Sequence, residues 1–232
     1  ILEVGSGAGR FSQIILNHTQ ANLYSVDFSS AVDANFSNNG PNQRLNLFQA
    51  DIYHMPFAKG QFDKVICFGV LQHTPNIEET IRVLIEMAKP GGEVIVDFYS
   101  ITGWWTKLNA KYILRPFLKK MSHAQLYSLL DRNMDALIAV YKFFSRIGLN
   151  KYINRFLPIC DIDRTLPRNL SYSALREHCL LDTFDMFSPA YDQPQKIETV
   201  VGIFKKYGLK DVSGGFVYFE NAKAAVVSGI KP

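Results

Sequence analysis

The 232-residue sequence is 47% hydrophobic and 20% charged with a formal net charge of +4, values that suit one sizeable core and a single domain with an insertion. Three widely spaced cysteines without a CxxC pair argue against a disulfide framework and a cysteine metal site. No apolar run approaches about 18 residues and no signal-peptide pattern opens the sequence, so we expect a cytoplasmic protein that neither spans a membrane nor is exported.

The first hundred residues alternate short apolar runs with helical periodicity. The run at residues 1–4 leads into a glycine-rich turn, after which Phe11, Ile14 and Ile15 recur at helical spacing. Because right-handed crossovers place helices on both faces of such a sheet, the pattern predicts a doubly wound, mostly parallel α/β sheet. The predicted strands are residues 1–4, 23–26, 45–50, 62–68 and 94–98, with helices starting at Ser29-Ser30 and spanning 77–87, and a Pro90-Gly91-Gly92 turn before the fifth strand.

After Tyr99 the strand pattern stops for about 95 residues. Apolar side chains from Leu126 to Phe144 recur at three- and four-residue steps, which predicts one long amphipathic helix over 122–145. A further helix over 197–207 ends at Gly208, and residues 211–217 and 224–228 then predict an antiparallel C-terminal strand pair around a turn near Glu220-Asn221. We therefore expect a core made of residues 1–100 and 191–232, with a helical insertion after the fifth strand, residues 101–190, as an acceptor-binding lid.

A glycine-rich turn and two acids fall at the carboxyl ends of the first three predicted strands. The turn Gly5-Ser6-Gly7-Ala8-Gly9 lets a carboxylate or phosphate approach bare backbone at a helix N-terminus. Arg10 stands where the dinucleotide fingerprint GxGxxG has its third glycine, which disfavours a pyrophosphate ligand. Asp27 can accept hydrogen bonds from ribose hydroxyls and Asp51 from an adenine amino group. Either acid alone could be a helix cap or a solvated turn residue; in register with the turn, they favour a nucleoside site.

The sequence resembles the class I S-adenosylmethionine-dependent methyltransferases over Ile1–Tyr99, and most resembles the small-molecule branch with the ubiquinone and menaquinone biosynthesis enzymes. Its successive motifs read ILEVGSGAGRFS, VDFS, QADIYHMPF, FDKVICFGVLQHTPN and AKPGGEVIVDFY. The resemblance implies a Rossmann-like fold with S-adenosylmethionine as cofactor. It also implies that Glu3, Gly5, Gly7 and Gly9 surround the methionine part, Asp27 holds the ribose, Phe28 flanks the adenine, Asp51 and Ile52 read its amino edge, and Phe68, Gly69 and Gln72 line the sulfonium side. Members of the family usually carry one or two helices before the first motif, which we expect to be missing here.

Two residues are candidates for contact with the methyl acceptor. His73 follows the fourth strand by five residues and suits proton removal near neutral pH, although it could instead cap the helix starting near Pro75 or simply pack there. Tyr191, beside Asp192 in the turn-rich segment SPAYDQPQ, could face the acceptor or be a packed tyrosine. The other histidines show no spacing typical of metal ligands, so we expect no metal site.

The insertion combines aromatic and basic residues, and residues 101–180 hold 13 Lys and Arg against 5 acids. This composition favours a small-molecule or lipid-like acceptor with negative charge, or peripheral membrane contact, although a solvated face over packed hydrophobic residues would look the same. RNA is a third possibility, but methylation of a base exocyclic amine is disfavoured because no Asn/Asp-Pro-Pro-aromatic motif follows the fourth strand, so we expect no nucleic-acid partner. The residues concerned are Trp104, Trp105, Tyr112, Phe117, Phe143, Phe144 and Phe156, with Lys107, Lys111, Arg115, Lys119, Lys120, Arg146, Lys151, Arg155, Arg164 and Arg168.

Three functional hypotheses follow from these patterns. The first is methyl transfer from S-adenosylmethionine by in-line displacement. The second is a regulatory module that binds the cofactor without catalysis and acts through its insertion on a partner. The third, a nicotinamide-dependent oxidoreductase, is disfavoured by Arg10 and by the lack of a recognisable hydride-transfer set. The sequence gives no indication of the oligomeric state.

Overall fold

A computed structural model describes residues 1–101, 103, 108–149, 153–165, 170–219 and 222–232. The chain divides into two compact units. Unit 1 comprises Ile1–Ser100, Tyr191–Val217 and Lys223–Pro232, and unit 2 comprises Ile101–Ala190 and Tyr218–Ala222. In the described part of the chain, no helix is both long enough and apolar enough to cross a bilayer.

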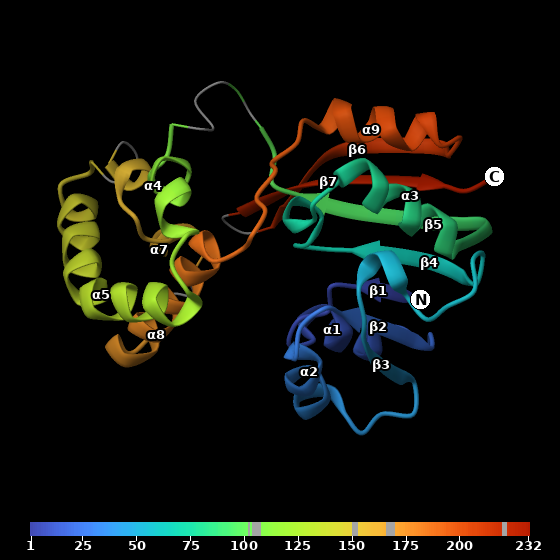
Figure 1. Ribbon diagram of the computed structural model, residues 1–232, viewed down its shortest axis with the longest axis horizontal. Helices are drawn as coiled ribbons and strands as arrows, with labels where there is room; N and C mark the ends of the chain where they lie inside the picture. Colours follow the sequence, from blue (N-terminus) through green and yellow to red (C-terminus); the bar gives the residue numbers. More distant parts are fainter. Residues whose placement is uncertain (102, 104–107, 150–152, 166–169, 220–221) are drawn as a thin grey trace. The chain divides into compact units, whose positions relative to one another are not determined.

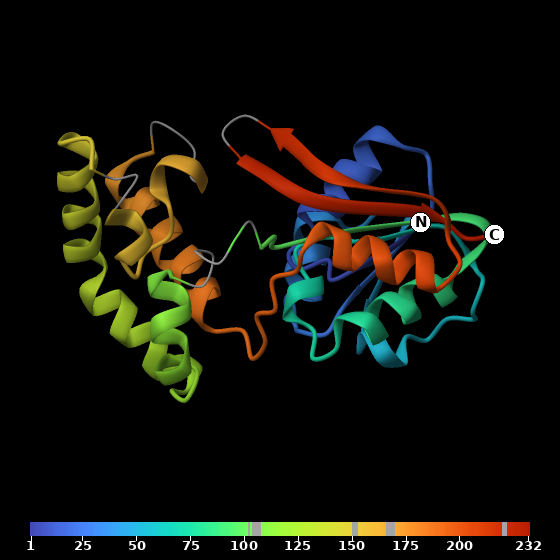
Figure 2. The same ribbon diagram turned by 90° about the horizontal axis from the view of Figure 1, so that it is seen from above.

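Unit 1 is built on a seven-stranded sheet in the order β3-β2-β1-β4-β5-β7-β6 (Figure 1). The first five strands run parallel and β7 pairs antiparallel with β5, which confirms the predicted sheet. Figure 2 shows β6 and β7 as a hairpin of opposed strands. The strands are β1 (Leu2–Val4), β2 (Leu23–Asp27), β3 (Leu45–Gln49), β4 (Phe62–Cys67), β5 (Ala88–Phe98), β6 (Lys210–Phe219) and β7 (Ala222–Ile230).

Helices cover both faces of this sheet, as the crossovers require. Figure 2 shows α3 and α9 on one face and the blue helices α1 and α2 on the other. Apolar residues of α3 and α9 pack with those of the strands in one core that includes Val65, Ile81 and Phe204. The helices are α1 (Arg10–His18), α2 (Ala31–Asn39), α3 (Ile77–Met87) and α9 (Ile197–Lys206).

The fifth strand begins earlier than the sequence predicted. It starts at Ala88 and runs through the Pro90-Gly91-Gly92 segment that was expected to be a turn. The pairing with β4 shifts register between Phe62 and Lys64, which face Ala88 and Glu93 respectively. The extra residues of β5 are accommodated at this irregularity. Gly91, with φ +78°, adopts the left-handed backbone conformation that the irregularity requires.

Unit 2 is helical and has its own core. Its longest helix, α5 (His123–Arg146), agrees with the helix that the periodicity predicted over 122–145, and it begins at a capping box between Ser122 and Gln125. Its buried stripe, which includes Leu130 and Met134, packs in one cluster with Cys179 and Phe187. Among the residues described here in unit 2, three α-helices were not predicted: α4 (Ala110–Leu118), α7 (Ile162–Thr165) and α8 (Tyr172–Phe187). Trp104, Trp105, Lys107, Lys151, Arg168, the Arg164 side chain and the Glu220-Asn221 turn lie outside the described residues.

Candidate functional site

The carboxyl ends of the parallel strands meet along one edge of the sheet, where ligands bind in open α/β folds. The registers place Val4 beside Val26, Asp27 beside Gln49 and Cys67 beside Val96. The residues that follow these positions, including the glycine turn after β1 and Phe68 after β4, therefore share this edge. Most of the candidate residues named above belong to these strand ends and loops.

The three glycines of the turn have positive φ, but for different reasons. A Cβ at Gly5 would lie 2.0 Å from Val70 Cγ2, and one at Gly9 would lie 2.1 Å from Asn35 Oδ1. At Gly7, with φ +51°, a Cβ would meet no heavy atom within 4 Å. Gly5 and Gly9 are thus fixed by protein neighbours, whereas the space beside Gly7 is open to a ligand.

Asparagines of α2 hold the outer side of the turn. Asn38 Nδ2 donates to Ala8 O, and Asn39 Nδ2 donates to Gly9 O, both at 2.9 Å. Asn35, fully buried one helical turn earlier, donates from Nδ2 to Ser12 Oγ at 2.9 Å. The first two bonds occupy carbonyl groups of the turn and tie it to α2.

Glu3 is buried beneath the turn, with only 3% of its surface exposed. Its Oε2 accepts hydrogen bonds from Ser12 Oγ at 2.6 Å and Ser25 Oγ at 2.5 Å, which tie β1 to α1 and β2. Burial raises the pKa of the Glu3 carboxyl above its ordinary value. Among the described residues Oε1 has no hydrogen-bond partner, so one buried acceptor remains for a donor from outside the chain.

The Asp27 carboxylate is hydrogen-bonded to the glycine turn. Its Oδ2 accepts from Gly7 N at 2.8 Å, and its Oδ1 accepts from Ser29 N at 2.9 Å and Ser29 Oγ at 2.7 Å. A carboxylate has about four lone-pair sites, so one further donor fits on Oδ2 without disturbing these bonds. Phe28, the next residue, is 77% exposed at the same edge.

Asp51 is both a candidate ligand and a cap. It precedes the 3₁₀ turn η1 (Ile52–His54), where its Oδ1 accepts from Tyr53 N at 3.0 Å and its Oδ2 lies 3.2 Å from His54 Nδ1. Ile52 packs against the main core of unit 1. The capping role considered from the sequence is therefore real, and it fixes the direction of the Asp51 side chain.

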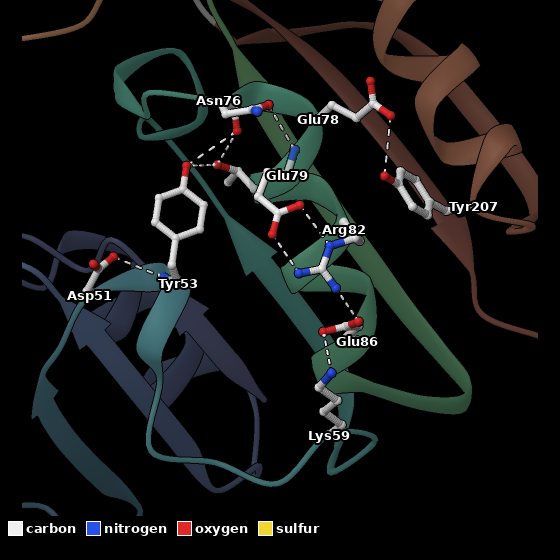
Figure 3. A network of polar contacts seen from close by, with 10 residues as sticks. Asp51, Tyr53, Lys59, Asn76, Glu78, Glu79, Arg82, Glu86 and Tyr207 are labelled. Atoms are coloured by element: carbon white, nitrogen blue, oxygen red, sulfur yellow. Dashed lines mark hydrogen bonds and ion pairs between the residues drawn. The ribbon is translucent and has the colours of Figure 1, made fainter.

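A polar network anchors this turn to α3 (Figure 3). Tyr53 Oη lies 2.8 Å from Thr80 Oγ1, and Asn76 caps α3 by accepting from Glu79 N at 3.1 Å. Further along the helix, Arg82 pairs with Glu79 and Glu86. Because Tyr53 follows Asp51 by two residues, the network restrains the backbone at Asp51.

The segment after β4, residues 69–75, is held from two sides at Gly69, which has φ +73°. Gly69 N donates a short hydrogen bond to Asp97 Oδ1 on β5, and Gln72 Nε2 donates to Gly69 O at 2.9 Å. Gln72 is fully buried, and within the described residues its Oε1 accepts no hydrogen bond. Phe68 stacks edge-on against Phe11 of α1, with ring centroids 5.1 Å apart.

His73 and Tyr191 are brought together, although 118 residues separate them. His73 Nδ1 lies 3.0 Å from Tyr191 O. The His73 ring packs edge-on against the Tyr99 ring, with ring centroids 5.6 Å apart. Asn76 rather than His73 caps α3, so the capping interpretation of His73 is wrong. The Tyr191 side chain is 46% exposed.

Sequence reasoning missed three residues of this edge. Asp97 binds Gly69 N from β5, and burial raises the pKa of its carboxyl. Ser6 is buried in the glycine turn, and its Oγ has no partner among the described residues. Gln193 binds the backbone of Thr74 at 2.7 Å. A signal existed only for Asp97, which lies near a strand end as Asp27 and Asp51 do.

The chemistry of the edge fits a ligand that carries hydrogen-bond donors. Glu3 Oε1, Ser6 Oγ and Gln72 Oε1 are buried oxygens that accept from no described residue, and buried acceptors are normally satisfied. A Cβ at either Gly7 or Gly69 would meet no heavy atom within 4 Å. Amino and hydroxyl groups of an amino-acid nucleoside would supply the missing donors. No three His, Cys, Asp or Glu side chains gather as metal ligands would in the described part of the chain.

The fold and this edge define an open α/β domain of the nucleoside-binding kind, with a glycine turn and acids at the ends of its parallel strands. Comparison with known proteins makes the class specific. Residues 2–96 match the methyltransferase domain family. The chain therefore contains a class I S-adenosylmethionine-dependent methyltransferase domain, a class whose cofactor is S-adenosylmethionine.

Individual relatives agree over the same part of the chain. A ubiquinone biosynthesis O-methyltransferase from Azoarcus sp. is 32% identical over 104 residues, which are 40% of this chain and 41% of that protein. A tRNA U34 carboxymethyltransferase from Nautilia profundicola is 30% identical over 105 residues, 44% of this chain and 35% of that protein. Each match thus spans less than half of the relative.

Among solved structures, the S-adenosylmethionine-dependent methyltransferase SibL in its apo form shares the fold. The TM-score is 0.54 at 17% identity, and the alignment covers 100% of this chain and 50% of that one.

Proposed function

We propose that the chain binds S-adenosylmethionine along the carboxyl edge of β1–β5 and transfers the methyl group to a small-molecule or lipid-like acceptor. The observation that carries the proposal is the glycine turn, where open space at Gly7 lies beside Asp27, whose Oδ2 accepts from Gly7 N. This arrangement supports cofactor binding at the edge where open α/β sheets bind nucleotides.

In this proposal each part of the edge holds one part of the cofactor. The methionine part lies against Gly5, Gly7 and Gly9, with Glu3 Oε1 as an acceptor for its amino group. Asp27 accepts from the ribose, Phe28 flanks the adenine, and Asp51 with Ile52 reads its amino edge. Phe68, Gly69 and Gln72 line the sulfonium side. The buried oxygens of Glu3 and Gln72 that have no hydrogen-bond partner among the described residues support the two ends of this placement.

Bound S-adenosylmethionine supplies an activated methyl group, so the protein has to align the acceptor and exclude water. Orientation of this kind can supply roughly 7 to 11 kcal/mol. Where the acceptor atom carries a proton, His73 is the base that removes it, and Tyr191 lines the acceptor side. The contact between His73 Nδ1 and Tyr191 O supports placing the two together.

We propose that residues 101–190 form the acceptor-binding lid. Large apolar side chains on unit 2 support a lipid-like acceptor or contact with a membrane surface, since Phe117 is 70% exposed, Phe143 58% and Phe156 59%. Basic residues of the same unit, such as Lys119, Lys120 and Arg146, favour a negatively charged partner. The name of the Azoarcus relative, a ubiquinone biosynthesis enzyme, agrees with an acceptor of this kind.

Calorimetric titration of S-adenosylhomocysteine tests the cofactor site, with NAD as the comparison ligand. We expect binding on the order of micromolar and no response to NAD. Asp27→Ala should weaken binding at least about tenfold, because a charge-assisted hydrogen bond contributes about 1.5 to 3 kcal/mol. Asp33→Ala, which removes an exposed acid of α2, is the matched control and should bind like the unchanged protein. A folded protein that does not bind S-adenosylhomocysteine would refute the proposal.

Transfer of a radiolabelled methyl group to fractionated cell extract tests the acceptor class. We expect label in the lipid or small-molecule fraction, and less of it in the His73→Gln protein. Label confined to RNA would contradict the proposed acceptor. Tight cofactor binding with no transfer to any fraction would instead favour a regulatory module that acts through the insertion.

A further inference from the structure

The segment Tyr191–Gln195, here called the return strap, runs along the loop that follows β4. Gln193 N donates to Gln72 O at 2.9 Å, and Gln193 Nε2 lies 2.7 Å from Thr74 O and 3.1 Å from Pro75 O. The carbonyl oxygen of Tyr191 lies 3.0 Å from Nδ1 of His73, the residue between Gln72 and Thr74. Each of residues 72–75 therefore touches the strap through a hydrogen bond.

The return strap is itself fastened to the end of β5. Gln195 N donates to Tyr99 O at 2.9 Å, Ser100 and Gln195 form a β-bridge, and Gln195 Nε2 donates to Gln193 O at 3.2 Å. Tyr99 also packs edge-on against the His73 ring. His73 thus contacts two segments that are bonded to each other.

The partner of Nδ1 determines which nitrogen of His73 carries the proton. A backbone carbonyl has lone pairs and no hydrogen, so it can only accept, and a hydrogen bond at 3.0 Å to Tyr191 O requires hydrogen on Nδ1. Neutral imidazole has one N–H, so the lone pair then resides on Nε2. The strap therefore selects one tautomer of the neutral side chain and sets the plane of the ring.

We propose that the return strap is a positioning element for the methyl transfer: the Tyr191 carbonyl fixes His73 with its lone pair on Nε2, and Gln193 holds the strap against the loop after β4. The inference rests on the proposed function, in which His73 is the base. As the acceptor atom bonds to the methyl carbon, the carbon–sulfur bond breaks with its electron pair going to sulfur. The proton of the acceptor atom passes to Nε2 of His73.

Gln193 suits this role because its amide group donates to two carbonyls of the loop. Glutamate has the same length and nearly the same shape, but its carboxylate has no hydrogen to donate. Gln193→Glu therefore puts a charged acceptor against the carbonyls of Thr74 and Pro75 while keeping the backbone bond to Gln72 O. The strap should then separate from the loop at the position of the Tyr191 carbonyl.

Two-bond ¹H–¹⁵N correlation spectra of ¹⁵N-labelled protein test the inference directly, with the His73 signals identified by their loss in His73→Gln. The unchanged protein at a pH where His73 is neutral should show the Nδ1–H form alone. Gln193→Glu should show both tautomers exchanging. The matched control Gln61→Glu carries the same change at an exposed position just before β4 and should keep the single tautomer.

The outcomes separate this inference from the proposed function. A single Nε2–H form in the unchanged protein would overturn it, and so would an unaltered Nδ1–H form in Gln193→Glu protein that remains folded by circular dichroism. The spectra require neither cofactor nor acceptor. Failure here therefore leaves methyl transfer standing, whereas the loss of S-adenosylhomocysteine binding would refute the proposed function itself.

Discussion

Alanine substitution at Gly7 and at Gly9 should separate ligand binding from folding within one short turn. At Gly9, with φ +87°, the new Cβ would lie 2.1 Å from Asn35 Oδ1 and 2.3 Å from Asn39 Nδ2. Both asparagines would have to move, and Asn35 is fully buried. At Gly7 the Cβ enters space that is empty of protein within 4 Å.

The expected stability costs follow from these contacts. A left-handed alanine costs about 1 to 2 kcal/mol, offset by about 0.4 to 1 kcal/mol from the stiffer unfolded chain. Gly7→Ala should therefore cost about 0 to 1.5 kcal/mol. Gly9→Ala adds about 1 to 3 kcal/mol for a buried polar group that loses its partner and about 1 kcal/mol for the bond from Asn39. Its total is about 2 to 5 kcal/mol.

Thermal unfolding by circular dichroism and calorimetric titration of S-adenosylhomocysteine measure the two effects. At about 2 to 4 °C per kcal/mol for a chain of this size, Gly9→Ala should lower the Tm by about 4 to 20 °C. Gly7→Ala should keep a Tm within about 6 °C of the unchanged protein and yet lose binding at least about tenfold. If Gly7→Ala binds the ligand normally, the turn is not the cofactor cradle. If the two variants are equally destabilised, the contacts of Gly9 do not govern folding.

Substitutions at three further residues test neighbouring features by urea unfolding. The pKa of Glu3 is raised in the folded protein, so the unfolded chain loses this proton at lower pH, and the free energy of unfolding falls as pH rises from about 4.5 toward the folded pKa. Glu3→Gln should remove this fall with pH. An unchanged pH dependence in the variant would contradict the prediction. Tyr53→Phe loses the bond to Thr80 Oγ1 and should cost about 0.5 to 1.5 kcal/mol. Asp97→Ala leaves Gly69 N without its acceptor and should lower the free energy of unfolding by about 1 to 3 kcal/mol. Asp97→Asn retains an acceptor oxygen and should lower it less. Equal losses in the two variants would show that this hydrogen bond does not contribute to stability.

Much of unit 1 could be predicted because its strands obey a simple rule. Strands buried on both faces are mostly apolar, and β4 follows this rule at Phe62 and Val65–Cys67, which are buried, although Asp63 and Lys64 interrupt the run. Helix α3 was predicted with its observed bounds, since its apolar residues recur at helical spacing. The long helix α5 was predicted over 122–145 for the same reason, although its cap at Ser122 was not.

The unpredicted helices lack that signal. Helix α8 buries Cys179 and Thr183 while Leu181 remains 47% exposed, so its apolar residues do not mark the buried face. Helix α4 contains Pro116, which sequence reasoning treats as a helix breaker. Both helices are stabilised by packing within unit 2, and packing between elements distant in sequence leaves little local trace.

The candidate site, too, could be predicted only where its residues lie close together in sequence. The glycine turn and the acids at strand ends could be named from local sequence, because each lies beside its own strand. The partnership of Gly69 with Asp97 depends on the register that sets Cys67 beside Val96. The contact of Gln193 with Thr74 joins positions 119 residues apart in the chain. Such contacts depend on the path of the whole chain and could not be inferred from spacing.

The strand order also determines when the protein can finish folding as it leaves the ribosome. Strand β7 lies between β5 and β6, yet it is the last of the seven to be synthesised. Until residues 222–230 emerge, β5 presents an unpaired edge along Glu93–Phe98, the segment that β7 later covers. All of residues 101–190 are made in that interval. The nascent chain must therefore keep an apolar strand edge shielded while unit 2 is synthesised, which makes this intermediate the one most exposed to aggregation or chaperone capture.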